Sequence, residues 1–162
     1  MSMSSHATAD LYDEHGENLR VLAPIFRDYG GTRTFCGPVA TLKVYEDNSL
    51  VRAALETPGQ GRVLVVDGGG SLRCALVGDN LAVLGQKNDW AGIVVYGCIR
   101  DSVPIGKIAI GVKALATNPR KSVKKGEGER DVTLRFAEVV INPGDYLYAD
   151  EDGIVVAAGK LG

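Results

Sequence analysis

The sequence predicts a layered α/β fold with a mixed sheet, and the order of its hydrophobic patterns carries this prediction. In the first two thirds of the chain, apolar runs typical of buried strands alternate with segments of helical character. In the last third, short strand-like segments follow one another and are separated by turn signals. Glycines flank most of the apolar runs, which indicates tight connections between layers.

The elements expected before residue 60 are two short helices, a strand or bent pair of strands, and a third helix. In order, they cover Asp10–His15, Asn18–Ala23, Thr32–Tyr45 and Ser49–Thr57. β-Branched and aromatic residues favour the strand. Asn48 is placed to cap the third helix, and Pro58 with Gly59 ends it.

The central third alternates two strands with two helical stretches. The strands are expected at Arg62–Asp67 and Gly92–Tyr96, and the helices at Ser71–Leu76 and Asn80–Gln86. Both strands are nearly continuous apolar runs, which indicates that they are covered on both faces. Gly78 interrupts the first helical stretch, and Asp79 is placed to cap the second.

Four further strands are predicted after residue 105. They cover Gly111–Thr117, Val132–Ile141, Tyr146–Ala149 and Gly153–Ala158. Pro143-Gly144-Asp145 and Glu151-Asp152-Gly153 are strong turn signals between them. A length of 162 residues suits one domain, so a single domain over residues 1–162 is predicted.

Composition and charge limit the class of partner. Hydrophobic residues make up 45% and charged residues 23%, a balance typical of soluble globular proteins. The net charge of −2 provides no general basic field, so direct nucleic-acid binding is not expected. The basic cluster Arg120, Lys121, Lys124 and Lys125 is followed at once by acidic residues, and we interpret it as a solvated loop.

The same survey favours a cytoplasmic protein. Met1–Asp10 lacks the basic start and apolar stretch of a signal peptide, and no uninterrupted apolar run is long enough to span a membrane. The three cysteines lie far apart and form no CxxC pair, which suits reduced thiols in the cytoplasm. Cys98 is interpreted as a small buried apolar residue and not as a nucleophile.

Two common kinds of site are disfavoured. The only histidines are His6 and His15, near the N-terminus, which argues against a histidine-rich zinc site and a Ser-His-Asp triad. Gly68–Gly70 after a strand suggests a phosphate loop, but no Lys-Ser/Thr pair follows it. A tight strand-to-helix connection is the preferred interpretation of these glycines.

The candidate site lies between Gly78 and Asp101. The segment Gly78, Asp79, Asn80 and Leu81 falls where a helix should begin, and the free N–H groups of a first helical turn attract an anion such as a carboxylate. Arg100 and Asp101 follow a buried strand, a favoured ligand position in α/β sheets. Arg100 can grip a carboxylate with its planar fork, and Asp101 offers a hard oxygen for Mg²⁺ or Mn²⁺.

Neither half of this site is specific by itself. An Arg-Asp pair after a strand is most often a surface or capping pair, and Asp79 as a plain helix cap is equally ordinary. However, Asp79, twenty intervening residues and Arg100-Asp101 resemble the D-x20-R-D signature of class II 4-hydroxy-4-methyl-2-oxoglutarate / 4-carboxy-4-hydroxy-2-oxoadipate aldolases.

The rest of the chain resembles the related family of the regulator of ribonuclease E activity A, or RraA. The matching stretches are YGGTRTFCGPVATLKVYEDNSLV, GRVLVVDGGGSLRCALVGDNLA, GIVVYGCIRD and NPGDYLYADEDGIVV. The resemblance runs from about Asp10 to the C-terminus. It implies a swivelling β/β/α domain with mixed sheets that assembles into a homotrimer, with sites in clefts between subunits.

The resemblance also implies residue roles. Gly78, Asp79, Asn80 and Leu81 would bind the pyruvyl carboxylate of a small 2-oxo acid substrate, Arg100 would bind substrate, and Asp101 would bind the divalent cation. Asp79 and Arg100 would be catalytic, Asp79 by orienting a water that takes the C4-hydroxyl proton. Because oxaloacetate decarboxylation passes through the same pyruvate enolate, one site would perform both reactions. Lys107 and Lys113, nearby in sequence, are expected to be solvated.

Two further functions stay open. The overall likeness to the regulator implies a protein that inhibits ribonuclease E through a trimer surface, although that regulator typically lacks the aspartate found here as Asp101. A phosphate-binding carrier using Gly68–Gly70 is the third possibility, and it lacks the reactive histidine that phosphoryl carriage requires.

Overall fold

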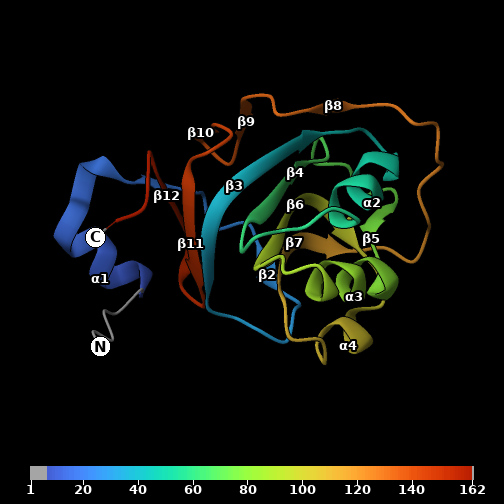
Figure 1. Cartoon of the computed structure of the whole chain (residues 1–162), viewed down its shortest axis with the longest axis horizontal. Coiled ribbons are helices and arrows are strands. Elements are labelled where there is room, and N and C mark those ends of the chain that lie inside the picture. The colour runs from blue at the N-terminus through green and yellow to red at the C-terminus, as the bar shows by residue number, and fades with distance from the viewer. Residues whose placement is uncertain (1–6, 162) are drawn as a thin grey trace.

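The computed structural model describes residues 7–161, whose elements are shown in Figure 1. Its helices are α1 (Thr8–His15), α2 (Ser49–Leu55), α3 (Asp79–Lys87) and α4 (Ser102–Ile105), with a 3₁₀ turn at Gly16–Asn18. Its strands are β1 (Arg20–Val21), β2 (Arg27–Asp28), β3 (Phe35–Lys43), β4 (Val63–Asp67), β5 (Ala75–Val77), β6 (Gly92–Ile99), β7 (Gly111–Thr117), β8 (Glu129–Arg130), β9 (Leu134–Phe136), β10 (Val139–Ile141), β11 (Tyr146–Asp150) and β12 (Gly153–Ala157). The predicted α/β class with a mixed sheet is confirmed.

The main sheet has a parallel centre and antiparallel flanks. Its strand order is β1-β12-β11-β3-β4-β6-β7-β2, and the neighbouring pairs from β3 to β7 are parallel. The strand β5 pairs with the last residues of β6, beyond the point where β4 ends. The strands β9 and β10 form a separate hairpin. The carboxyl ends of β5 and β6 therefore lie side by side at one edge of the sheet.

The sheet is covered on both faces. Figure 1 shows α2, α3 and α4 gathered on one side of the central strands. Alternate residues of β4 divide accordingly: Leu64 and Val66 join the core beneath the helices, whereas Val63 and Val65 join the core with β9–β12. Both cores bury their side chains almost completely, so the helices are held firmly against the strands.

An aromatic ring from β3 packs onto two glycines of the parallel centre. Gly92 and Gly111 are register partners in β6 and β7, and a Cβ atom on either would lie within 2.4 Å of a ring carbon of Phe35. These positions therefore admit no side chain while Phe35 is in place. This close contact joins the antiparallel flank to the parallel strands that support the candidate site.

Several predicted elements are confirmed, and three are wrong. Asn18–Ala23 is not a helix, because Arg20 and Val21 pair with β12. Ser71–Leu76 is also not helical: it bends at Arg73 and Cys74 and ends in β5, which pairs with β6. The predicted strand Val132–Ile141 is a hairpin, whose turn has positive φ at Ala137 (51°) and Glu138 (69°).

Two predicted caps are also wrong. Asn48 precedes α2 without a capping hydrogen bond, and Oδ1 of Asp47 instead accepts from the backbone N–H and the hydroxyl of Ser49. Asp79 is the first residue inside α3, and Gly78 takes the cap position. At the start of α2, Asp47 and not Asn48 accepts from the N–H of Ser49, and Asp47 is also bound by the N–H groups of Lys125 and Glu127.

Of three side chains whose burial was predicted individually, two agree with the prediction and one does not. Cys98 is buried, as expected, and Lys107 is exposed. Lys113, expected to be solvated, is only 3% exposed: its ammonium donates to the carbonyl of Asp150 at 2.6 Å and lies 3.2 Å from Oδ1 of Asp28. Within residues 7–161, no helix is long and apolar enough to cross a membrane.

Candidate active site

All six residues proposed from the sequence line one pocket. This cavity of about 170 Å³ lies at the carboxyl edge of β5 and β6. The proposed residues in its wall are Gly78, Asp79, Asn80, Leu81, Arg100 and Asp101. The remaining wall comes from α2, its preceding loop, the first residue of β5 and the segment between β7 and β8: Asn48, Arg52, Ala75, Lys121, Ser122 and Lys124. The juxtaposition expected from the sequence is therefore present.

The parallel pairing of β5 and β6 brings the two halves of the site together. Pairing continues one residue past β6, where the N–H of Arg100 donates to the carbonyl of Val77 at 2.9 Å. Asp101 then adopts a left-handed conformation (φ 60°, ψ 43°), which aspartate tolerates better than most residues. This turn sends the chain into α4 and leaves the Asp101 side chain exposed at the pocket.

The start of α3 presents backbone donors to the same pocket. The first intrahelical bond at this end runs from the N–H of Ala82 to the carbonyl of Gly78, so the preceding N–H groups have no acceptor within the helix. The N–H of Asp79 donates to Oδ2 of Asp101 at 3.1 Å. Those of Asn80 and Leu81 belong to the same turn, where the helix dipole favours an anion.

Gly78 permits the two halves to approach closely. A Cβ atom at this position would lie 2.8 Å from Oδ2 of Asp101 and 3.6 Å from Nε of Arg100. A side chain would therefore displace the carboxylate from the N–H of Asp79. Gly78 is therefore needed because a larger residue would not fit. The sequence pattern showed this glycine as a break in a predicted helical stretch and gave no sign of this close contact.

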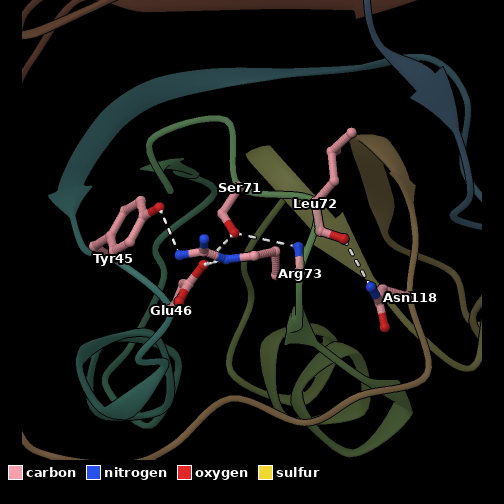
Figure 2. A network of polar contacts seen from close by, with 6 residues as sticks. All are labelled: Tyr45, Glu46, Ser71, Leu72, Arg73 and Asn118. Carbon is pink, nitrogen blue, oxygen red and sulfur yellow. Dashed lines mark hydrogen bonds and ion pairs between the residues drawn. The ribbon is translucent and has the colours of Figure 1, made fainter.

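A polar network holds the loops that surround the pocket. Figure 2 shows Arg73 reaching Glu46 and Tyr45, with the Ser71 hydroxyl also donating to Glu46. The Arg73 Nε–Glu46 Oε2 distance is 2.7 Å, and this hydrogen bond is the main reason that the pKa of Glu46 is lowered. The network joins the loop after β3 to the segment before β5.

The same network reaches the backbone that contacts Arg100. The side-chain amide of Asn118 donates to the carbonyl of Leu72 at 2.7 Å, as Figure 2 shows, and its oxygen accepts from the N–H of Arg120. Between these two residues, the carbonyl of Pro119 accepts from Nη1 of Arg100 at 3.3 Å. The guanidinium is thereby held at the rim while its other N–H groups remain available to a ligand.

The side chains of the basic loop are exposed, as expected of a solvated loop, but the loop also contributes to the pocket wall. Lys121 and Lys124 line the pocket, and the loop that carries them is anchored to the fold. Lys121 forms a parallel bridge with Ala75, whose N–H donates to the carbonyl of Arg120 at 2.7 Å. The contacts are between residues about 46 positions apart in the chain, so no local pattern could have revealed them.

Asp47 is the buried residue that anchors the rest of this loop. Its Oδ2 accepts from the N–H groups of Lys125 and Glu127 at 2.9 and 3.0 Å, and its Oδ1 accepts from Ser49. Burial is the largest single influence and would raise the pKa of Asp47. The hydrogen bonds from Ser49, Glu127 and Lys125 outweigh it and lower the pKa to about 2. The carboxylate is therefore charged at neutral pH.

The pocket has oxygen donors that fit a hard divalent cation. No group of three or more His, Cys, Asp or Glu side chains able to hold a metal occurs within residues 7–161. A cation here would rely on one or two carboxylates, with water and substrate completing its shell, as is common for Mg²⁺. Asp101 meets this need, since one of its oxygens accepts from Asp79 and leaves the other for a cation.

Asn48 adds an unsatisfied acceptor to the pocket wall. Its amide nitrogen donates to the carbonyl of Leu76 at 3.1 Å, but its carboxamide oxygen is buried and has no hydrogen-bond partner among the residues described. A buried acceptor without a partner is costly. The pocket therefore suits a ligand or water that donates a hydrogen bond to Asn48, a residue that sequence reasoning treated only as a cap.

The glycine run at residues 68–70 does not form a phosphate loop. The N–H groups of Gly68 and Gly70 donate to the carbonyl of Tyr96, and that of Gly69 donates to Oδ1 of Asp67. No helix follows, so the expected strand-to-helix connection joins β4 to β5 instead. His6 lies outside the described residues, and His15 is at the end of α1.

A family model supports the resemblance noted in the sequence. The model, described as RraA-like, Aldolase/RraA, matches residues 8–156. The chain belongs to the Aldolase/RraA family. The matched range includes every residue of the pocket, from Asn48 to Lys124.

Two relatives in the Aldolase/RraA family carry an enzyme name. A protein of Alkalilimnicola ehrlichii named "Putative 4-hydroxy-4-methyl-2-oxoglutarate aldolase" is 66% identical over 154 residues, covering 95% of this chain and 96% of the relative. A protein of Aromatoleum aromaticum with the same name is 60% identical over 154 residues, covering 95% and 97%.

Two solved structures of similar fold carry other names. The RNA-processing inhibitor RraA from Thermus thermophilis has a TM-score of 0.94 and 46% sequence identity, covering 99% of this chain and 96% of that one. A protein from Geobacillus kaustophilus described as S-adenosylmethionine: 2-dimethylmenaquinone methyltransferase has a TM-score of 0.94 and 54% identity, covering 96% of each. The RraA fold predicted from the resemblance is thus confirmed. Because the similar proteins carry different functional names, the residues of the pocket must be used to distinguish among these activities.

Proposed function

We propose that this protein is a divalent-metal-dependent aldolase that cleaves 4-hydroxy-4-methyl-2-oxoglutarate to pyruvate and also decarboxylates oxaloacetate. The observation that carries the proposal is the meeting of Asp101, Arg100 and the start of α3 in one pocket. These groups match the three needs of a 2-oxo acid: a cation for the keto oxygen, a guanidinium for developing charge, and N–H groups for the carboxylate.

Different groups in the pocket bind the substrate carboxylate, stabilise the developing charge and hold the cation. The N–H groups of Asn80 and Leu81 bind the pyruvyl carboxylate at the positive end of α3. Arg100, held by the carbonyl of Pro119, places its free N–H groups beside the oxygen that gains charge as the bond breaks. Asp101 holds Mg²⁺ or Mn²⁺, which when bound acts as a Lewis acid on the 2-oxo group.

Cleavage of the C3–C4 bond requires that the C4 hydroxyl lose a proton and that C3 gain one. The C3–C4 bond breaks, its electron pair passes to C3 to form the pyruvate enolate, and the C4 hydroxyl loses its proton to become a carbonyl. Asp79 lines the pocket next to Asp101 and orients a water that takes this proton. The same water then protonates C3 of the enolate. In oxaloacetate, loss of carbon dioxide produces the same enolate, so only the final protonation is needed.

A pyruvate assay coupled to lactate dehydrogenase tests the activity directly. With Mg²⁺ or Mn²⁺, pyruvate should form from both substrates, and a chelator should abolish it. Because metal ions alone decarboxylate oxaloacetate, the rate without protein must be subtracted. Failure to release pyruvate from either substrate with any added divalent cation would refute the proposed activity.

Arg100→Lys should lower kcat/KM for both substrates by about 100-fold, because an ammonium cannot reproduce the planar fork and removing a transition-state donor typically costs this much. Arg33→Lys is the matched control, since Arg33 is exposed and does not line the pocket. Both variants are measured in the pyruvate assay. Unchanged kcat/KM in Arg100→Lys would contradict the assigned role.

The pocket does not favour a methyltransferase. A site for an adenosine cofactor needs an apolar or aromatic wall for the base. Among the residues that line this pocket, none is aromatic, and six carry a charge. Binding of S-adenosylmethionine, measured by calorimetry, is expected to be undetectable at millimolar concentration.

The 46% identity to an RNA-processing inhibitor supports a second candidate function, inhibition of ribonuclease E through a homotrimer surface. This function does not use the pocket, so it can coexist with the first. Addition of the protein to a ribonuclease E cleavage assay tests it. No change in RNA cleavage at micromolar concentration would reject it.

A further inference from the structure

We infer that Asn48 is a positioning residue of this pocket, which fixes, together with Ser122, the water that carries protons to and from the substrate. The inference rests on the proposed function, in which Asp79 orients that water. It concerns two polar groups that the binding of the carboxylate, the keto group and the cation leaves unused. Both line the pocket, Asn48 from the loop before α2 and Ser122 from the segment between β7 and β8.

The carboxamide of Asn48 is fixed in one orientation. Its Nδ2 donates to the carbonyl of Leu76 at 3.1 Å, and its backbone N–H donates to Oγ of Ser122 at 3.2 Å. If the carboxamide rotated by half a turn, Oδ1 would face the carbonyl oxygen of Leu76, and two acceptors would meet without a hydrogen atom between them. Oδ1 is therefore held in its present position, where it is buried and has no hydrogen-bond partner among residues 7–161.

The Oδ1 atom of Asn48 requires a small hydrogen-bond donor. Buried polar groups almost always have a partner, and leaving one without it costs more than a typical hydrogen bond contributes. The cations Arg52, Lys121 and Lys124 line the same cavity, but none of them donates to this oxygen. Water suits the position because it is small, donates two hydrogen bonds and is the usual partner of buried polar groups that the protein leaves unsatisfied.

Ser122 provides a donor beside this acceptor. It is 4% exposed, and its oxygen accepts from the N–H of Asn48, so this bond does not use the hydroxyl proton. The hydroxyl can therefore donate to a molecule in the pocket. A water that donates to Oδ1 of Asn48 and accepts from Ser122 keeps one proton and one lone pair for other partners.

Asp79 is the acceptor for the remaining proton of this water. Leu76, to which Asn48 is bound, lies three residues before Asp79, and Asp79 lines the same pocket. A water that donates to both Asn48 and Asp79 cannot rotate freely, whereas Asp79 alone would hold it by a single hydrogen bond. The last lone pair of the water then faces the substrate, which is the orientation that proton transfer requires.

The proton transfers balance in this arrangement. The C4-hydroxyl proton passes to the water as a proton of the water passes to the Asp79 carboxylate. When the enolate is protonated, the water gives a proton to C3 and recovers one from Asp79. Asn48 exchanges no proton, because its carboxamide oxygen only accepts a hydrogen bond. It acts on the reaction through the water.

Asn48→Leu should lower kcat for pyruvate formation from 4-hydroxy-4-methyl-2-oxoglutarate by about 10- to 50-fold, because leucine is similar in size and offers no acceptor. KM should stay within about threefold, since Asn48 holds the water and not the substrate. Asn48→Ala should cost less, about 5- to 10-fold, because the space it leaves admits a second water in place of the carboxamide oxygen. An unchanged kcat in Asn48→Leu, or a loss confined to KM, would overturn the assignment.

Asn88→Ala is the matched control for the loss of a structural carboxamide. Asn88 also donates from Nδ2 to a backbone carbonyl, that of Leu55 at 2.7 Å, but it does not line the pocket. In urea unfolding it should be destabilised about as much as Asn48→Ala, and its kcat should stay within about twofold of the wild type. A loss of kcat equal to that in Asn48→Ala would assign the effect to general loosening of the fold and would overturn the positioning role.

Exchange of the C3 protons of pyruvate with deuterium oxide, followed by NMR, separates proton transfer from bond cleavage. With Mg²⁺, the wild type should catalyse this exchange, and Asn48→Leu should slow it by the same factor as kcat. Pyruvate affinity, measured by calorimetry, should stay within about threefold. If neither substrate is cleaved but this pattern holds, the proposed reaction fails and the positioning role stands. If the wild type cleaves substrate and exchange is undiminished in Asn48→Leu, the reaction stands and the positioning role fails.

A crystal structure with Mg²⁺ and pyruvate bound tests the position of the water without turnover. A water should lie about 2.5–3.0 Å from Oδ1 of Asn48 and from a carboxylate oxygen of Asp79. A pyruvate atom at hydrogen-bond distance from Oδ1, or a water that contacts only one of the two residues, would overturn the inference.

Discussion

Asp101→Asn is expected to lower kcat for pyruvate formation by at least about 100-fold, the largest catalytic effect of any single substitution in this pocket. The neutral amide is a poor ligand for Mg²⁺ or Mn²⁺, and the described residues offer no cluster of acidic, histidine or cysteine side chains to replace the carboxylate. The rate is measured with the coupled assay over a range of metal concentrations. Binding of Mn²⁺, followed by electron paramagnetic resonance, should weaken in parallel.

Asp101→Asn is a clean probe because it preserves the local structure. Asparagine tolerates the left-handed conformation of this position, and its oxygen can still accept from the N–H of Asp79. Asp89→Asn is the matched control, since Asp89 has a similar backbone conformation (φ 65°), is exposed and does not line the pocket. Normal turnover or normal Mn²⁺ binding in Asp101→Asn would remove the assigned role of this carboxylate.

Asp47→Ala is expected to lower the free energy of unfolding by about 2–4 kcal/mol, because a charged acceptor of several hydrogen bonds is lost from a buried position. Asp47 is only 2% exposed, and its loss leaves the N–H groups of Ser49, Lys125 and Glu127 without this acceptor. Urea unfolding followed by circular dichroism measures the change. Ser49→Ala, which removes only hydroxyl bonds, should cost about 1 kcal/mol.

The contribution of Asp47 depends on pH in a defined direction. Its pKa in the folded protein is about 2, lower than the usual 3.8, so ionised Asp47 stabilises the folded state above pH 3.8. That contribution is lost as the pH falls from 3.8 through about 2. The stability difference between wild type and Asp47→Ala should therefore shrink in this window. A difference that stays constant from neutral pH down through it would show that the carboxylate charge is not involved.

Local sequence patterns correctly predicted the elements in which the local conformational preference matches the conformation found in the fold. The buried strands β4 and β6 were found from apolar runs and the helix α3 from its flanking glycine and aspartate. Patterns failed where distant contacts decided the conformation. Residues 71–74 and 20–21 have helical character, yet the first segment leads into a strand beside β6 and the second pairs with β12. A strand partner that is far away in the chain leaves no local signal.

The sequence by itself determined the family resemblance and half of the pocket wall. Gly78–Leu81 and Arg100-Asp101 were recognised because each follows or precedes a regular element at a characteristic spacing. The tertiary structure alone decided the opposite wall. Arg52 belongs to another helix, and Lys121 and Lys124 reach the pocket only because Ala75 and the buried carboxylate of Asp47 hold their loop there. Hydrogen bonds between distant segments form only once the chain has folded, so the charge of this pocket could not be read from residue order.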